Sequence, residues 1–350
     1  MSDMRSQIDA MAQRLFGEKV DRTVLNAAAD GRWPKELWDA AVDAGLTASV
    51  VPENKGGIGL GWRETYPVIR AAGRNCAPIP LAETIVASTL LARAKIPVPD
   101  GVLSLQPGNP ADRLKLFRDG GSWRLSGIVW GIPWGSLADY VVLNAIHDEK
   151  PYRIVAPTAG IKVIAGHNLA GEPRDRLMFD GIQVDAAPIG GKSGSDCART
   201  LGALARTGQL SGAFEAILQD TVRHVNERKQ FGRPLARFQV VQHSLAVMAE
   251  EVAATRVAAE AAFIATDRGD STFEVAVAKV RAYAAVGAVT SIAHQLLGAL
   301  GFTREHHLQH LTRRAWAWRG EFGGEREWAS LLGRQVLEAA NGAWPLLTEH

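Results

Sequence analysis

Cysteine is scarce in this chain of 350 residues. Cys76 and Cys197 are its two cysteines, too few for a disulfide framework or a cysteine-rich zinc site. An excess of one charge is also missing, because 39 Lys and Arg face 37 Asp and Glu, for a net charge of +2. Proteins that neutralise phosphate backbones usually carry a larger, clustered basic excess. We therefore expect no nucleic-acid partner.

Long apolar runs are absent as well. No stretch approaches the roughly 18 uninterrupted apolar residues of a membrane-spanning helix, so we expect no membrane span. Residues 1–16 carry charges throughout and lack the apolar segment of a secretory signal. Hydrophobic residues make up 47% and charged residues 22% of the chain, close to the average of globular proteins. These features predict a folded cytoplasmic protein.

Several familiar catalytic motifs are missing too. The sequence has no G-x-S-x-G elbow and no phosphate-binding P-loop, and its acidic residues show no paired spacing. GGIGLG at residues 56–61 differs from the dinucleotide fingerprint G-x-G-x-x-G and lacks its strand–helix context. We favour a turn between helices there over nucleotide binding. His306 and His310 share a helical spacing, but no third ligand is obvious, and we expect no metal site.

What is present divides into three zones. Residues 1–97 show the spacing of amphipathic helices. Residues 98–190 change to short β-branched runs separated by turn residues, which predicts a β domain of about six strands. Residues 191–350 return to long, alanine-rich helices, a pattern typical of a four-helix bundle. The helical patterns cover residues 33–46, 62–73 and 81–94 in the first zone, and 200–226, 240–268, 273–298, 305–318 and 325–341 in the third.

The turn between the first two long helices of the third zone is the most informative motif. It reads RKQFGRPLARFQ over residues 228–239 and contains Gly232 and Pro234. Arg228 offers a planar guanidinium group that suits a phosphate or pyrophosphate, and Phe231 offers a flat apolar surface. From spacing alone, a helical hairpin with a solvated turn is the simpler interpretation.

This motif resembles the signature R-x-Q-F-G-x-P-L-x-x-F-Q-x-x-Q of the acyl-CoA dehydrogenase family, flavoproteins that oxidise the α,β carbon–carbon bond of acyl-CoA thioesters. Residues 33–61 are similar to the family's N-terminal helix and loop, and residues 294–316 to its Q-x-x-G-G segment and following helix. The resemblance implies an α+β multidomain fold. It consists of an N-terminal helical domain (1–97), a middle β-barrel-like domain (98–190) and a C-terminal four-helix bundle (191–350).

The resemblance also implies FAD as the cofactor. In the family, the arginine that matches Arg228 reaches the FAD pyrophosphate of a neighbouring subunit. Further matching positions line the same FAD or meet its adenosine end. A shared FAD implies a dimer or a tetramer, built from one kind of chain or from two. The matching positions are Gln230, Phe231, Phe238 and Gln239 in the turn region, and Gln295, Gly298 and Ala299 in the Q-x-x-G-G segment.

The sequence departs from the family pattern where the catalytic base is expected. The usual base is a glutamate in a Y-E-G-T-like loop, and its position falls on Phe322, whose ring cannot abstract a proton. Some members carry the base on the long helix before the R-x-Q-F-G turn, and that position falls near Gly202, with no acid within several residues. The flavin-holding loops of the β domain are altered as well. The loop at 104–116 is shorter, and Pro133 stands where a threonine is expected.

These departures leave two hypotheses. In the first, the chain is an active dehydrogenase in which Glu321 is the base, and its position between Trp318 and Phe322 raises the pKa of its carboxyl group. A solvated loop carboxylate, or a partner of Arg319 or Arg326, is the simpler interpretation of Glu321. In the second hypothesis, the chain is a non-catalytic subunit that lends its FAD-binding residues to a complete partner.

The resemblance further implies a substrate, an electron acceptor and a metabolic role. The substrate is an acyl-CoA, the acceptor an electron-transfer flavoprotein or a similar protein, and the role lies in fatty acid or lipid metabolism. Trp318 and Phe322 are predicted substrate contacts, although tryptophans at helical spacing more often lie in a core or an interface. Arg313 and Arg314 could pair with CoA phosphates or with neighbouring acids, and the sequence leaves both possibilities open.

Overall fold

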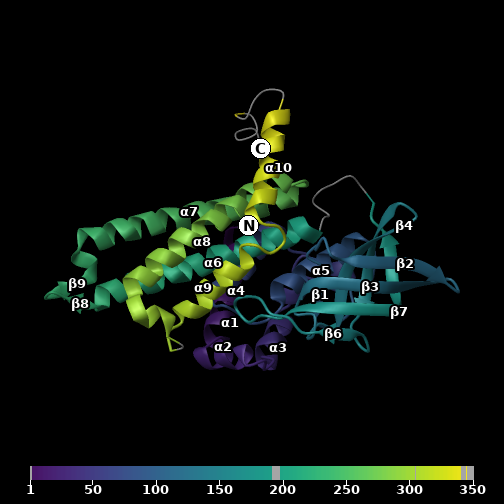
Figure 1. The fold of residues 1–350 in the computed structure, drawn as a ribbon, viewed down its shortest axis with the longest axis horizontal. Helices are drawn as coiled ribbons and strands as arrows, with labels where there is room; N and C mark the ends of the chain where they lie inside the picture. Colours follow the sequence, from purple (N-terminus) through teal and green to yellow (C-terminus); the bar gives the residue numbers. More distant parts are fainter. Residues whose placement is uncertain (1, 191–197, 304, 340–343, 345–350) are drawn as a thin grey trace.

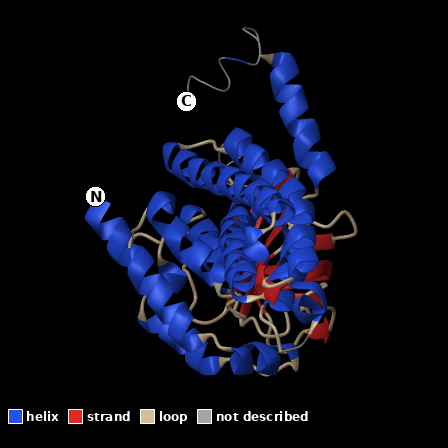
Figure 2. Ribbon diagram, turned by 90° about the vertical axis from the view of Figure 1, so that its left-hand side faces the viewer, coloured by secondary structure: helices blue, strands red, loops and turns tan. Residues whose placement is uncertain are grey.

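The chain folds into helical parts at both ends of the sequence and a sheet between them. The structure, a computed structural model, describes residues 2–190, 198–303, 305–339 and 344. In Figure 1 the sheet lies at one end of the molecule, and the long C-terminal helices extend from it toward the opposite end. In the view of Figure 2, turned by 90° so that the end opposite the sheet faces the viewer, the long helices lie in front of the strands.

The N-terminal part packs its fourth and fifth helices into the interior. Nearly all residues of the fifth helix are buried, because it lies between the sheet and the long helices. The predicted helices at 62–73 and 81–94 therefore match the structure closely. The elements are α1 (Ser2–Lys19), α2 (Arg22–Ala29), α3 (Lys35–Asp43), η1 (Leu46–Ala48), η2 (Glu53–Lys55), α4 (Trp62–Arg74) and α5 (Leu81–Arg93).

The glycine-rich loop at 56–61 is a tight turn that leads into α4. Gly56 and Gly59 have φ angles of 86° and 76°, a region that glycine adopts without strain. A Cβ atom on Gly57 would lie 2.0 Å from the carbonyl oxygen of Val51. The glycines thus serve the geometry of the turn itself.

The middle part forms one seven-stranded sheet in the order β1-β4-β5-β7-β3-β2, with β6 paired to β7. The predicted barrel-like closure is wrong, because the sheet is open and its end strands β1 and β2 do not pair within the described residues. The register places Pro133 opposite Arg174. The strands are β1 (Leu103–Leu105), β2 (Arg113–Asp119), β3 (Ser122–Pro133), β4 (Tyr140–His147), β5 (Lys150–Pro157), β6 (Lys162–Ile164) and β7 (Arg174–Pro188).

The C-terminal part is a bundle of long helices, with a small hairpin at the turn between its first two helices. The predicted ranges agree with the structure within a few residues, and residues 340–341 of the last predicted helix lie outside the described part. The elements are α6 (Ala198–Glu227), β8 (Lys229–Gln230), β9 (Arg233–Pro234), η4 (Leu235–Arg237), α7 (Gln239–Arg268), α8 (Thr272–Leu297), η5 (Gly298–Phe302), α9 (Leu308–Trp318) and α10 (Glu325–Glu338).

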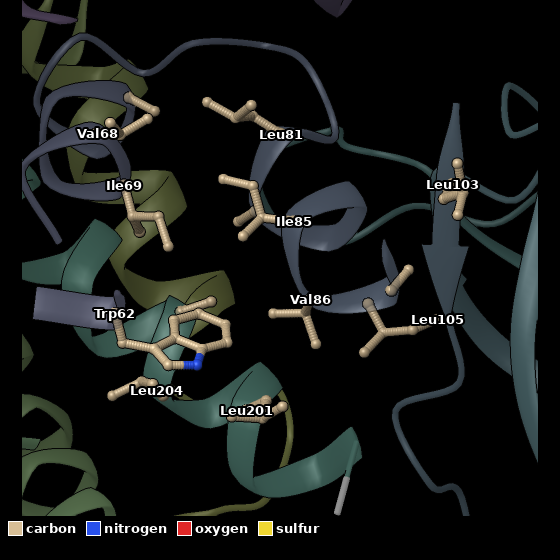
Figure 3. Close-up of a cluster of buried hydrophobic side chains, with 14 of the residues drawn as sticks. Trp62, Val68, Ile69, Leu81, Ile85, Val86, Leu103, Leu105, Leu201 and Leu204 are labelled. Atoms are coloured by element: carbon tan, nitrogen blue, oxygen red, sulfur yellow. The ribbon is translucent and has the colours of Figure 1, made fainter. Parts of the chain in front are cut away.

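One core joins the three parts. Figure 3 shows buried apolar side chains of α4, α5, β1 and α6 gathered in a single cluster. Trp62, Ile85 and Leu201 represent the three helices, and Leu105 the strand. Burial of such side chains contributes roughly 1.5–3 kcal/mol each. The predicted boundaries at 97/98 and 190/191 fall in the connections between these parts and stay predictions.

Helix α8 has an unusual composition for a bundle helix. Residues Thr272–Phe302 have the length and the apolar composition of a membrane-crossing helix, and 39% of their apolar 18-residue stretch is buried inside the structure. The core helix of a soluble bundle can have the same length and composition. The apolar part of α8 that stays uncovered becomes relevant to the assembly below.

Candidate functional site

A cleft of about 510 Å³ opens between the sheet and the loop that joins α9 to α10. The register of β3 and β7 brings Pro133 and Arg174 to its sheet side. The helical side comes from the end of α9 and from residues 320–324. The lining residues are Pro107, Gly108, Asn109, Pro110, Gly131, Pro133, His167, Asn168, Leu169 and Arg174 on the sheet side, and Ala317, Gly320, Glu321, Phe322, Gly323, Gly324 and Glu327 on the helical side.

The two positions predicted for a catalytic base meet at this cleft. Phe322 is only 3% exposed and is one of the residues that line the cleft. Its ring packs directly on Gly202, because a Cβ atom there would lie 2.3 Å from the ring. One expected base position therefore holds the aromatic ring of Phe322, and the other holds Gly202, which has no side chain. Neither residue can accept a proton from a substrate.

Glu321 lies beside Phe322 but is held by two arginines. Arg174 donates from Nε to Oε1 (2.7 Å) and from Nη2 to Oε2 (2.9 Å). Arg206 donates from Nε to Oε2 (2.8 Å), and Asn168 donates to Oε1 (3.1 Å). Two-pronged pairing of this kind is the strongest arrangement available to an arginine and a carboxylate. The carboxylate thus has four donors and keeps little freedom to reach a substrate.

The electrostatics of Glu321 follow from these contacts. Burial acts to raise the pKa of its carboxyl group, but Arg174 and Arg206 outweigh it and lower the pKa to about 2. The raised pKa predicted for Glu321 is therefore wrong. The prediction considered only the apolar neighbours Trp318 and Phe322, whereas the arginines come from β7 and α6. A carboxylate this acidic is a poor base near neutral pH.

A buried network extends from Glu321 into all three parts of the chain. Arg206 also pairs with Glu83 of α5, and both side chains are 2% exposed. On the sheet side, Glu172 accepts hydrogen bonds from Arg174 (3.1 Å) and from the α9 side chain Arg314 (3.1 Å). Buried charges are tolerated only when they are paired in this way.

The remaining predicted substrate and CoA contacts separate into two groups. Trp318 is buried behind the cleft wall, where its indole N–H donates to Glu172 (2.8 Å). Arg314 is likewise buried, so its ion pair is internal. Arg313 is exposed and donates to the carbonyl oxygen of Leu169 on the cleft edge (3.0 Å). Of the two predicted substrate contacts, Phe322 alone lines the cleft.

The sheet side of the cleft offers few donors to a flavin ring. Pro107, Pro110 and Pro133 carry no backbone N–H. Asp112 accepts from the backbone N–H groups of Asn109 (3.0 Å) and Trp130 (2.8 Å). Fewer backbone N–H groups are therefore available to a flavin ring at this wall.

The tryptophan that follows Pro133 also faces away from the cleft. Trp134 has a φ angle of 56°, and its side chain lines a separate cavity of about 390 Å³ next to the α2–α3 turn. A left-handed conformation is costly for such a bulky residue. The strand end thus directs its aromatic ring to the N-terminal helices.

The residues predicted to bind FAD gather at the opposite end of the bundle. Figure 1 shows β8 and β9 at the end farthest from the sheet. Arg228 is exposed there and forms no ion pair within the described residues. Phe231 is 90% exposed, with a φ angle of 51°, and its ring centroid lies 6.2 Å from that of Phe238. Gln230 and Gln239 are exposed in the same segment.

The second predicted group lies at the end of α8. Gln295, Gly298 and Ala299 are all exposed, and Gly298 has a φ angle of 60°. Figure 1 shows that α6 and α8 both end away from the sheet. The two groups therefore share one end of the bundle, far from the chain's own cleft. A guanidinium, amides and exposed aromatic rings form a donor set that fits a pyrophosphate and flat rings.

The predicted helical pair of histidines shows no metal geometry. His306 accepts a hydrogen bond from the backbone N–H of Leu308 (3.1 Å), and His310 contacts Gln309. In the described part of the chain, no group of three or more His, Cys, Asp or Glu side chains is placed to hold a metal ion.

The charged residues behind the cleft were not predicted from the sequence. Arg206, Glu83, Glu172 and Lys279 are buried, and each comes from a different segment. One weak signal was available, since Lys279 interrupts an apolar run in α8 and Arg206 interrupts one in α6. Their partners cannot be read from such interruptions.

The chain matches known proteins over most of its length. A model of the acyl-CoA dehydrogenase N-terminal domain matches residues 2–95, and a model of the C-terminal domain of the same family matches residues 200–330. Acyl-CoA dehydrogenase FadE27 of Mycobacterium tuberculosis is 30% identical over 232 residues, which is 61% of this chain and 62% of FadE27. Cyclohex-1-ene-1-carbonyl-CoA dehydrogenase of Syntrophus aciditrophicus is 25% identical over 87% of this chain and 83% of its own.

The fold has close structural relatives as well. The crystal structure of the ChsE4-ChsE5 complex from Mycobacterium tuberculosis superposes with a TM-score of 0.88 at 24% identity. The superposition covers 97% of this chain and 98% of the other. The helix–sheet–helix arrangement is thus a known fold.

Proposed function

Because the chain belongs to the acyl-CoA dehydrogenase family, we propose that it is a base-free subunit of an FAD-containing acyl-CoA dehydrogenase. Enzymes of this family are oxidoreductases that act on the CH–CH bond of acyl-CoA thioesters. In our proposal, a second chain of the same family supplies the carboxylate that removes the α-proton. The present chain supplies residues that bind the FAD of that partner.

The contact between Phe322 and Gly202 carries this proposal. Abstraction of a weakly acidic α-proton needs a positioned base within hydrogen-bond reach of the substrate. Phe322 occupies one expected base position and Gly202 the other, and the ring fills the space between them. A carboxylate at either position is therefore absent from this chain.

Glu321 does not replace the missing base in this arrangement. Its pKa of about 2 leaves it ionised but weakly basic, and Arg174 and Arg206 occupy its oxygens. Releasing the carboxylate would leave two buried guanidinium groups without their partner, which is costly. We propose that Glu321 links the cleft loop to β7 and α6.

The exposed end of the bundle supports the cofactor part of the proposal. Arg228 directly precedes β8 and Gln295 lies in the last turn of α8, and both elements end away from the sheet in Figure 1, so the two residues suit the FAD of a neighbouring chain. Arg228 would pair with the pyrophosphate of that FAD, and the exposed aromatic rings and amides near Phe231 would contact its ring systems. When bound, FAD accepts the hydride from the β-carbon, and an electron-transfer flavoprotein or a similar protein then reoxidises it.

The surface of α8 supports the assembly. Helix α8 is apolar in composition and is covered only in part by its own chain, and an apolar helix surface that a partner can cover suits an interface. The structurally similar ChsE4-ChsE5 is a complex. We propose the same kind of pairing here, with a second family member as the partner.

A flavin-bleaching experiment tests the proposal. The chain is purified alone, mixed with FAD, freed of unbound cofactor and titrated without oxygen with butyryl-, octanoyl- and palmitoyl-CoA. We expect no acyl-CoA-dependent loss of the flavin absorption band. Glu321→Gln is the matched control, and we expect it to behave as the wild type does. Bleaching by the wild type that Glu321→Gln abolishes would show that Glu321 is the base, and the proposal would be wrong.

A further inference from the structure

The loop between α9 and α10 is fixed by side chains that come from outside it. Lys279 of α8 donates from Nζ to the carbonyl oxygens of Glu321 (2.7 Å) and Trp318 (3.2 Å). Trp328 of α10 donates from Nε1 to the carbonyl oxygen of Phe322 (3.1 Å). Together with the arginines on the carboxylate of Glu321, these bonds determine both the backbone and the direction of the loop.

Lys279 is an unusual residue for this position. Its side chain is 0% exposed and lies among Val275, Ala276, Ala278 and Ala282 of the same helix. Burial of an ammonium group is unfavourable unless hydrogen bonds compensate for the lost water. The two loop carbonyls provide part of that compensation, and they lie at the end of α9, where the helix dipole favours a positive charge. The residue is therefore suited to hold this loop.

The loop conformation is one that Phe322 would not adopt by itself. Its φ angle is 56°, in the left-handed region that is costly for a bulky side chain. Such a conformation persists only when surrounding contacts determine it. In this conformation the ring packs on Gly202 and forms part of the cleft wall.

The space behind the ring is filled as well. The guanidinium carbon of Arg206 lies 5.5 Å from the centroid of the Phe322 ring, and Arg206 pairs there with Glu83. Both charged side chains are buried. An acyl chain can therefore pass beyond the cleft wall at this point only if the Phe322 ring moves off Gly202.

We infer that Lys279 is a positioning residue that keeps the Phe322 ring on Gly202 and so excludes the acyl chain of a thioester from this chain's own cleft. The inference rests on the proposed function, since it explains how the base-free chain avoids binding substrate that it cannot convert. Phe322 is the residue that determines this specificity, and Lys279 acts through it.

Binding of octanoyl-CoA and of CoA without an acyl group tests the inference. Both affinities are measured by calorimetry for the full-length wild type and for Phe322→Ala, Lys279→Met and Lys162→Met. We expect the wild type to show no preference for octanoyl-CoA, whereas Phe322→Ala and Lys279→Met gain a preference of at least about tenfold, or 1.4 kcal/mol. Lys162→Met changes an exposed lysine of β6 and is expected to behave as the wild type does.

An acyl-specific gain in affinity with one molecule bound per chain separates positioning from general loss of structure, because the apolar surface of a loosened chain binds octanoyl-CoA without a fixed stoichiometry. Two results would overturn the inference. One is a wild type that already prefers octanoyl-CoA. The other is a Lys279→Met variant without preference beside a Phe322→Ala variant that has one. Failure of the proposed function has a different signature, namely bleaching of flavin by the wild type.

Discussion

At the scale of single residues, the environment of Glu321 decides its chemistry. A carboxyl group in an apolar pocket has a raised pKa and can serve as an acid or base, whereas one paired with arginines stays ionised. Glu321 has apolar neighbours in the sequence and arginine neighbours in space. A buried ion pair of this kind connects segments of the chain, but it stabilises the fold no more than well-packed apolar residues of the same volume would.

Replacement of Glu321 tests this structural role through acid stability. The carboxyl pKa falls from its ordinary value of 4.5 to about 2 in the fold, so its stabilisation is present above pH 4.5 and is lost as pH falls from 4.5 toward 2. Glu321→Gln leaves Arg174 and Arg206 without their partner, and we expect it to lower the free energy of unfolding by about 3 kcal/mol at pH 7. Urea denaturation at pH 7 and pH 4 measures the effect.

The difference between wild type and Glu321→Gln is expected to shrink at pH 4. Glu53→Gln, at an exposed position in η2, is the control and is expected to change the free energy of unfolding by less than about 0.5 kcal/mol. A difference for Glu321→Gln that stays constant with pH would contradict the role of its charge.

Lys279 makes a prediction of the same sign on the alkaline side. Burial lowers the pKa of its ammonium group from 10.5 to about 7, so between pH 7 and 10.5 the unfolded chain binds more protons than the folded chain. The stability of the wild type therefore rises with pH in this window relative to Lys279→Met, by up to about 1.4 kcal/mol per pH unit. Denaturation at pH 7 and pH 9, with both proteins in the same buffers, measures the difference. If the free energies of unfolding of the wild type and of Lys279→Met differ by the same amount at both pH values, Lys279 does not titrate in this window and the prediction is wrong.

At the scale of elements, the helices were predictable because their apolar spacing repeats over several turns. The predicted range 200–226 became α6 (Ala198–Glu227), and 240–268 became α7 (Gln239–Arg268). The closure of the sheet was not predictable, since it depends on whether β1 and β2 pair, and pairing partners lie outside local sequence. The alternation of side chains gives strands but not their neighbours.

The crossing of α4 and α6 provides a prediction at this scale. The two helices touch backbone to backbone, since a Cβ atom on Gly212 would lie 1.9 Å from the carbonyl oxygen of Arg70. We expect Gly212→Ala to push the helices apart and to lower the free energy of unfolding by about 1–3 kcal/mol. Gly17→Ala in α1 meets no atom within 4 Å and is expected to raise it by about 0.5–1 kcal/mol. Thermal denaturation measures whether Gly212→Ala lowers stability and Gly17→Ala raises it. The same change in stability for both variants would contradict the close crossing of α4 and α6.

At the scale of the whole molecule, the sequence predicted where the family motifs lie but not what replaces the missing base. The hairpin with Arg228 is local and could be read directly. The network around the cleft joins Glu83, Glu172, Arg206 and Glu321, which are far apart in the chain. A single sequence does not show which charged residues pair, because no local feature of the sequence identifies the partner of each residue.

The separation of the cleft from the hairpin leads to the last prediction. If Arg228 binds the FAD of a partner chain, its loss weakens FAD in the mixed assembly and leaves this chain's own fold intact. We expect Arg228→Met, combined with a base-bearing family member, to bind FAD roughly 10–100-fold more weakly, since a hydrogen bond to a charged group contributes about 1.5–3 kcal/mol. Arg268→Met, at the opposite end of α7, is the matched control.

Flavin content per assembly and the melting temperature of the isolated chain are measured together, because a loss of flavin with an unchanged melting temperature assigns Arg228 to the partner's cofactor. Equal flavin content in both variants would remove the hairpin from the cofactor site and leave its exposed arginine and phenylalanine without a ligand.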